Sequence, residues 1–239
     1  MLETKCKIVL CISWTINTLL VFLLCYVTFY ATDLSQRIGT KLGLCQYVPA
    51  RADNDCVDSW NNCIKKLDMK VDVVFFGDSH TAGGDFQKAF SNVKSLNLGY
   101  IGEDTKGMLR RVKAIAVVQP KKIFLMAGIN GLKCQSLSDF EYWYTALVDS
   151  IRTAVPNAEL YIENILPVTA SSGYCGNVKI REANKIVQHI AHERNITYID
   201  LHTAYADKET LPENMSYDGL HLTDDAYNIW YEAIKKIVE

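Results

Sequence analysis

Four short segments of the sequence contain the residue types that acyl transfer requires. They are Gly77-Asp78-Ser79-His80, Asn97-Leu98-Gly99, Gly128-Ile129-Asn130-Gly131 and Asp218-Gly219-Leu220-His221. A serine hydroxyl is a weak nucleophile, and it becomes reactive when a neighbouring histidine accepts its proton. Asp218 stands three residues before His221, so in a turn or helix the carboxylate can meet the imidazole and fix its tautomer. The pattern predicts Ser79 as nucleophile, His221 as general base and Asp218 as its orienting acid.

The same segments offer hydrogen-bond donors for the negative charge that develops on the carbonyl oxygen during acyl transfer. The predicted donors are the backbone N–H groups of Ser79 and Gly99 and the side-chain amide of Asn130. Glycine at position 99 lets the backbone come close to a substrate. Each segment alone is typical of an ordinary turn, but their order along the chain favours the functional interpretation.

Two other histidines have chemically relevant neighbours in the sequence. His80 follows Ser79 directly, and at a strand-to-helix turn its side chain is expected to point away from the serine hydroxyl. Asp200 and His202 form a second acid–histidine pair at the end of a predicted strand. We interpret this second pair as structural.

The cysteines suggest one disulfide and no metal site. Five of the eight follow residue 31, namely Cys45, Cys56, Cys63, Cys134 and Cys175. An extracytoplasmic compartment permits disulfides, and an odd number leaves at least one free thiol. Cys134 and Cys175 both follow predicted strand ends, so a bridge between them is predicted, with reduced cysteines as the alternative. No cysteine or histidine spacing is typical of zinc, and we expect neither metal nor cofactor.

Strands and helices that alternate along the chain must position these residues. Apolar or β-branched runs predict strands over 71–76, 93–98, 123–127, 160–166 and 197–201. Helical periodicity is found over 81–90, 105–118, 138–155, 178–194 and 224–238, with Ser138 and Thr223 as predicted helix caps. This alternation predicts a parallel sheet with helices on both faces, which binds ligands at the carboxyl ends of its strands.

The N-terminus contains an uncharged, mostly apolar run over 8–30. A helix of this length is about 35 Å long, enough to span a bilayer. Lys5 and Lys7 precede it, which predicts a cytoplasmic N-terminus and an extracytoplasmic remainder. The predicted organisation is a transmembrane signal anchor over 1–31, a stalk or cap over 32–70 and a catalytic α/β domain over 71–239. A cleaved signal peptide and a lipoprotein cysteine at Cys25 are the alternatives.

Charge excludes one class of partner. The chain has 25 Lys and Arg against 27 Asp and Glu, a formal net charge of -2. Without a basic run or interleaved arginine and aromatic residues, nucleic acid is not an expected partner. The sequence leaves the oligomeric state open.

The sequence from about residue 71 to 239 resembles the SGNH (GDSL-type) hydrolase family. The segments FFGDSHTAGG, LNLGYIGEDT, IFLMAGIN and YDGLHLTDDAY are similar to its four motif blocks. Residues 71–130 look most like the platelet-activating-factor-acetylhydrolase-like branch, whose members cleave small acyl esters. The resemblance implies a flavodoxin-like three-layer α/β/α sandwich without metal or organic cofactor, and the same roles for Ser79, Asp218, His221, Gly99 and Asn130.

Two positions depart from the family pattern. Gly131 follows Asn130 where the family usually has aspartate, and His80 follows Ser79 where an aliphatic residue is common. The missing carboxylate is expected to affect the order of its loop rather than the chemistry.

The expected activity is therefore hydrolysis of a small acyl ester, most simply acetyl, through an acyl-enzyme on Ser79. The predicted anchor places the site at the cell envelope, where an O-acetylated glycan is the expected substrate. Three alternatives remain open: a lysolipid or lipid ester hydrolase, an O-acyltransferase, and a non-catalytic envelope-binding protein on the same scaffold.

Overall fold

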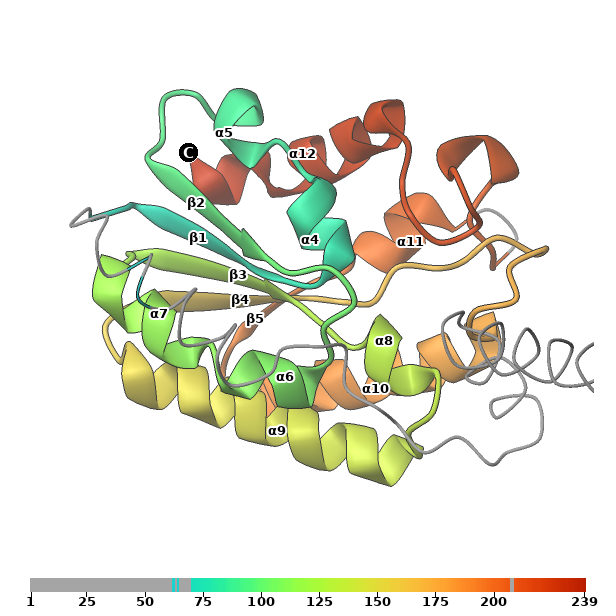
Figure 1. Ribbon diagram of the computed structural model, residues 1–239, viewed down its shortest axis with the longest axis horizontal. Helices are drawn as coiled ribbons and strands as arrows, with labels where there is room; N and C mark the ends of the chain where they lie inside the picture. The colour runs from blue at the N-terminus through green and yellow to red at the C-terminus, as the bar shows by residue number, and fades with distance from the viewer. Residues whose placement is uncertain (1–61, 63, 65–69, 207–208) are drawn as a thin grey trace, which may run out of the picture. The chain divides into compact units, whose positions relative to one another are not determined.

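The computed structural model describes residues 62, 64, 70–206 and 209–239. Contacts divide the chain into two units, Met1–Gln46 and Tyr47–Glu239, and every described residue belongs to the second. This unit contains a five-stranded sheet covered by helices on both faces (Figure 1).

All strands of the sheet run parallel, as predicted. They are β1 (Val73–Gly77), β2 (Ser95–Gly99), β3 (Lys122–Met126), β4 (Glu159–Glu163) and β5 (Thr197–Ile199). Their order β2-β1-β3-β4-β5 is that of a flavodoxin-like fold, with the switch point between β1 and β3. Gly77, the last residue of β1, lies opposite Gly99 of β2 and Met126 of β3. The segments that follow these three strands therefore meet at one edge of the sheet.

Two layers of helices complete the sandwich (Figure 1). One face is covered by α6 (Thr105–Leu109), α7 (Val112–Val118), α8 (Ile129–Leu132), α9 (Leu137–Ala154) and α10 (Asn177–Glu193). The other is covered by α4 (Ser79–Gly83), α5 (Phe86–Ala89), α11 (Leu201–Tyr205) and α12 (Asp224–Val238). The predicted three-layer α/β/α architecture is confirmed.

The alternating side chains of β1 explain why its sequence is apolar throughout. Val74 and Phe76 pack in the core under α7 and α9, whereas Val73 and Phe75 pack in the core under α5 and α12. Successive side chains of a strand point to opposite faces. A strand covered on both faces therefore buries every position, and all five residues of β1 are buried.

Several predicted helix boundaries are wrong. The helix predicted over 81–90 is divided into α4 and α5 by Gly84, whose extended backbone has a ψ of 133°. The helix predicted over 105–118 is divided into α6 and α7 at Arg110 and Arg111. Helix α9 is capped by Ser136 rather than Ser138, because the Ser136 hydroxyl accepts the N–H of Asp139 at 3.1 Å. Thr223 caps α12 as predicted.

The predicted disulfide between Cys134 and Cys175 is wrong. Cys134 is disulfide-bonded, whereas Cys175 is a buried free cysteine, so the partner of Cys134 lies outside the described residues. Cys175 is buried and belongs to the core cluster that contains residues of α9 and α10. Burial raises the pKa of this thiol, although Lys179 acts in the opposite direction.

Within the described part of the chain, no helix is both long and apolar enough to cross a membrane. The anchor predicted over 1–31 lies outside the described residues. The predicted stalk or cap over 32–70 also lies outside them, except for residues 62, 64 and 70. The anchor and the domain boundaries stay predictions.

Candidate active site

The turn between β1 and α4 presents Ser79 at the carboxyl edge of the sheet. Asp78 caps α4 by accepting the N–H of His80 at 3.0 Å. A Cβ atom at Gly77 would lie 2.5 Å from the Met126 carbonyl oxygen, so the tight turn requires glycine there. Because Ser79 is the first residue of α4, its N–H has no acceptor within the helix and can serve a ligand.

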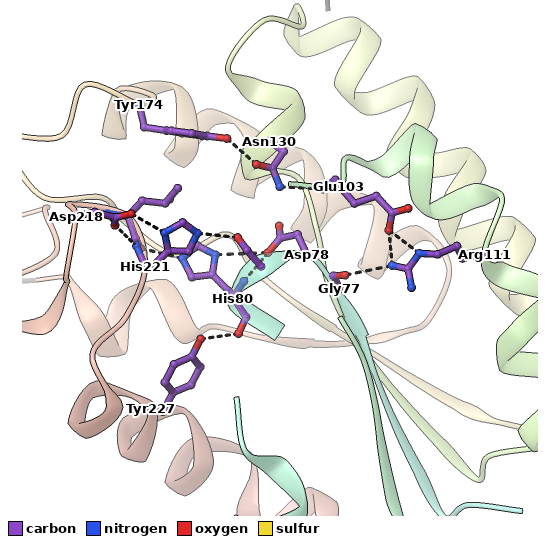
Figure 2. A network of polar contacts seen from close by, with 12 residues as sticks. Gly77, Asp78, His80, Glu103, Arg111, Asn130, Tyr174, Asp218, His221 and Tyr227 are labelled. Carbon is purple, nitrogen blue, oxygen red and sulfur yellow. Dashed lines mark hydrogen bonds and ion pairs between the residues drawn. The ribbon is translucent and has the colours of Figure 1, made fainter. Parts of the chain in front are cut away.

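The structure brings Ser79, His221 and Asp218 together. His221 Nε2 lies 3.0 Å from Ser79 Oγ, and His221 Nδ1 lies 2.7 Å from Asp218 Oδ2 (Figure 2). Asp218 Oδ1 also accepts the backbone N–H groups of Leu220 and His221, at 3.0 and 2.8 Å. The hydroxyl, imidazole and carboxylate are thus hydrogen-bonded in series, the geometry in which histidine can take the proton of serine.

The loop that carries His221 keeps Asp218 ionised. Gly219, between the two residues, has a φ of 86°, which L side chains rarely adopt. Burial raises the pKa of Asp218, but hydrogen bonds from the side chain and backbone of His221 and from Leu220 N–H outweigh it. The pKa of Asp218 therefore lies below its ordinary value. A carboxylate in this position can stabilise the imidazolium that forms when His221 takes a proton.

Glycine at position 99 is needed for the packing of α4 against β2. The sequence had predicted a different reason, the close approach of a substrate. A Cβ atom at this position would lie 2.2 Å from Ala82 N, so glycine lets α4 pack against β2. The N–H of Gly99 donates to Asn97 Oδ1 at 2.8 Å, and the amide of Asn97 donates to Thr81 O and Gly84 O. Of the three predicted oxyanion donors, Gly99 N–H already has an acceptor within the chain.

Asn130 lies in α8, at the end of β3 and next to the switch point. Its Nδ2 donates to the Glu103 carbonyl oxygen at 2.9 Å, and its Oδ1 accepts the Tyr174 hydroxyl at 2.6 Å (Figure 2). Gly128 starts this turn with a φ of 131° and caps α8. No sequence pattern predicts the contact with Tyr174, which lies 44 residues away from Asn130.

Gln135 fills the space beside Gly131, where the family resemblance implies an aspartate. A Cβ atom at Gly131 would lie 2.8 Å from Gln135 Oε1. Gln135 Nε2 donates to Asp104 Oδ2 at 3.2 Å, and Asp104 caps α6. The amide of Gln135 thus connects the turn that follows α8 to the N-terminus of α6, beside the position where a carboxylate is missing.

His80 is a buried structural residue beside the site. Its Nε2 lies 2.9 Å from the Leu220 carbonyl oxygen, and its Nδ1 lies 3.5 Å from Asp78 Oδ1 (Figure 2). Burial lowers the pKa of His80, but the interactions with Asp78 outweigh it and leave the pKa above its ordinary value. Since Leu220 directly precedes His221, His80 holds the loop of the candidate base in place. The expectation that His80 is not the base agrees with these contacts.

The Asp200–His202 pair has structural contacts, in agreement with its interpretation from the sequence. Asp200 caps α11 by accepting Thr203 N–H. His202 Nδ1 lies 3.0 Å from the Ile165 carbonyl oxygen, and its backbone N–H donates to Asn164 at 2.7 Å.

A buried ion pair lies beneath the site and was missed in the sequence. Arg111 and Glu103 are each 1% exposed, and Arg111 Nε donates to Glu103 Oε2 at 2.7 Å. The guanidinium also donates to Leu98 O at 2.9 Å. It donates to Gly77 O as well, at 3.4 Å (Figure 2). One side chain therefore joins the ends of β1 and β2 to the turn that carries Glu103.

The fold is a flavodoxin-like sandwich, and serine, histidine and aspartate are hydrogen-bonded in series at its switch point. This combination is typical of α/β hydrolytic enzymes with a serine nucleophile. The GDSL-like Lipase/Acylhydrolase family profile matches residues 75–229, more than half of the chain. The protein belongs to this family, which confirms the resemblance to SGNH hydrolases. No curated protein sequence matches the chain.

Solved structures share the fold at low sequence identity. A protein from Streptococcus pneumonia, provisionally described as a platelet activating factor, is 22% identical with a TM-score of 0.68, and covers 76% of this chain and 92% of its own. A GDSL-like lipase from Bacteroides thetaiotaomicron is 17% identical with a TM-score of 0.63, covering 78% and 97%. A catalytic mutant of an acetylxylan esterase from Geobacillus stearothermophilus is 16% identical with a TM-score of 0.59, covering 71% and 94%.

Proposed function

We propose that the protein is a serine esterase that hydrolyses small acyl esters through an acyl-enzyme on Ser79. The observation that carries the proposal is the 3.0 Å separation of Ser79 Oγ and His221 Nε2, with Asp218 hydrogen-bonded to the far side of the imidazole. The family profile supports an acylhydrolase as the general class.

The proposed reaction has two halves that use the same base. Ser79 Oγ attacks the ester carbonyl while His221 takes its proton, and His221 then gives that proton to the departing alcohol. A water molecule attacks the acyl-enzyme while His221 takes a proton from it, and His221 then returns this proton to Ser79 Oγ as the carbonyl–Ser79 bond breaks and the acid is released. Ser79 N–H and the Asn130 amide donate to the oxyanion in both halves.

An acetyl group on a glycan is the proposed substrate. Tyr217 directly precedes Asp218, and its ring is 68% exposed. The Tyr217 hydroxyl donates to Asp224 Oδ1 at 3.1 Å and accepts Asp224 N–H at 3.3 Å, which fixes the ring in place. An exposed aromatic ring held in one orientation can stack on a sugar at low entropic cost. The acetylxylan esterase with the same fold is consistent with this proposal.

The substrate proposal predicts two results for the full-length chain. The protein should hydrolyse acetyl esters faster than a longer acyl ester. The acetyl substrates are p-nitrophenyl acetate and acetylated xylo-oligosaccharides, and the longer one is p-nitrophenyl octanoate. Tyr217→Ala should raise KM for the acetylated oligosaccharide by about 2- to 10-fold, with less than about a twofold change for p-nitrophenyl acetate. Tyr142→Ala, which removes an exposed tyrosine on α9, is the matched control. Faster octanoate cleavage would favour a lipid ester, and equal effects on both acetyl substrates would remove Tyr217 as a sugar contact.

We also propose that a signal anchor over 8–30 places this domain on the extracytoplasmic side of a membrane. The disulfide at Cys134 supports this location, because disulfides persist mainly in oxidising compartments. In intact cells that express the full chain, a membrane-impermeant amine reagent should label the exposed Lys235 and Lys236 of α12. Labelling only after lysis would contradict the proposed location.

A further inference from the structure

The amide of Asn130 can serve an oxyanion only in one orientation. A side-chain amide has two N–H donors on nitrogen and acceptor lone pairs on oxygen. One N–H of Asn130 donates to the Glu103 carbonyl oxygen, which can only accept. A flipped amide would place Asn130 Oδ1 against that carbonyl, so Glu103 favours the orientation in which nitrogen faces it. The second N–H is then the group available to a ligand.

The turn that carries the Glu103 carbonyl is held in place by buried hydrogen bonds. The Glu103 carboxylate pairs with Arg111 in the buried ion pair described above, and Arg111 is also hydrogen-bonded to Leu98 O. The carbonyl that accepts from Asn130 is therefore attached to a turn fixed against β2. By itself, however, the hydrogen bond to the Glu103 carbonyl holds only the nitrogen of the Asn130 amide. It leaves Asn130 Oδ1 without a donor.

Tyr174 holds the opposite end of the amide. Its hydroxyl donates to Asn130 Oδ1 at 2.6 Å (Figure 2). Its ring lies 4.9 Å from Lys133 Nζ. The segment that carries Tyr174 also contacts the loop of the candidate acid, because Thr169 N–H donates to Gly219 O at 3.0 Å. One segment thus contacts both the oxyanion side and the acid–base side of the site.

We infer that Tyr174 is a positioning residue for the reaction proposed above. Its hydroxyl holds Asn130 Oδ1 away from the developing oxyanion, so that the second amide N–H donates to that charge. Asn130 is only 8% exposed, so without the hydroxyl its Oδ1 lacks a donor in a buried environment and the amide rotates toward another partner. The inference rests on the proposed function, because Tyr174 acts through Asn130 and does not touch the reacting atoms.

A double-mutant cycle tests the inference with the full-length chain and p-nitrophenyl acetate. Tyr174→Phe should lower kcat by about 3- to 10-fold and change KM by less than about twofold. Asn130→Ala should lower kcat by about 10²- to 10³-fold. In the Asn130→Ala background, adding Tyr174→Phe should change kcat by less than about twofold, because the residue through which it acts is gone. Residual rates are measured against Ser79→Ala, and Tyr142→Phe is the matched control.

Each outcome of the cycle has a defined meaning. Independent effects, with Tyr174→Phe still lowering kcat several-fold in the Asn130→Ala background, would overturn the inference and show that Tyr174 acts on the substrate or on the fold. An unchanged kcat in Tyr174→Phe would overturn it as well. An inactive, folded wild type would overturn the proposed function together with the inference, whereas an active wild type with independent effects would overturn the inference alone.

Discussion

Ser79→Ala is expected to reduce kcat for p-nitrophenyl acetate by at least about 10³-fold. The substitution removes the oxygen that forms the acyl-enzyme in the proposed reaction, while His221 and the proposed oxyanion donors stay in place. The Ser79 side chain is small and lies at the sheet edge, where its Oγ is hydrogen-bonded to His221. The fold should therefore tolerate alanine, with a circular dichroism spectrum and thermal unfolding midpoint close to those of the wild type.

The exposed serine at position 91 provides the matched control, and Ser91→Ala should retain the wild-type kcat. A fluorophosphonate probe should add its mass to Ser79 in the wild type and leave Ser79→Ala unlabelled in mass spectrometry of the peptides. Wild-type activity in Ser79→Ala would remove Ser79 as the nucleophile. A folded wild type without activity and without labelling would favour a non-catalytic binding protein on this scaffold.

Arg111→Met is expected to lower the free energy of unfolding by about 3–5 kcal/mol. The change leaves the buried Glu103 carboxylate without its cation and removes the donors to Leu98 O and Gly77 O. Burial raises the pKa of Glu103, and Arg111 counteracts this in the wild type. Urea unfolding monitored by tryptophan fluorescence measures the difference.

The pH dependence and a second variant separate the lost charge pair from lost packing. Without Arg111 the folded-state pKa of Glu103 rises further above its unfolded value. The variant should then be closest to wild type below about pH 4, the ordinary range of a glutamate, and lose stability as pH rises through the folded-state pKa. Arg111→Met combined with Glu103→Leu should recover most of the loss, because neither buried charge remains. A double variant as unstable as Arg111→Met would show that packing or the backbone bonds dominate.

The local sequence pattern was sufficient to predict the sheet. β1 is a short apolar run, whereas β2 contains polar residues at alternate positions, and the alternation of strands with helical periods specifies parallel crossovers. The strand ends then predict where the candidate catalytic residues lie, because parallel strands bring their carboxyl ends to one edge of the sheet. Helix breaks were harder to predict, since Gly84 and the Arg110–Arg111 junction interrupt segments whose periodicity is continuous.

The structural role of a residue was harder to predict from the sequence than its place near the site. Gly99 was assigned to substrate approach, yet the structure shows that it makes room for the backbone of α4. The pairing of Cys134 with Cys175 failed because position after a strand does not show which way a side chain turns. Both properties depend on neighbours that are distant in sequence.

The order of strands and helices along the chain, and the residues whose chemistry can transfer an acyl group, can be predicted from the amino-acid sequence. Residue type and short-range spacing carry that information, as in the three residues from Asp218 to His221. Three contacts are visible only in the folded chain: Ser79 meets His221 across 142 positions, Tyr174 holds the Asn130 amide, and Arg111 pairs with Glu103. These contacts join different segments at the carboxyl edge of the sheet, and their geometry depends on how the helices pack over the strands rather than on any local pattern.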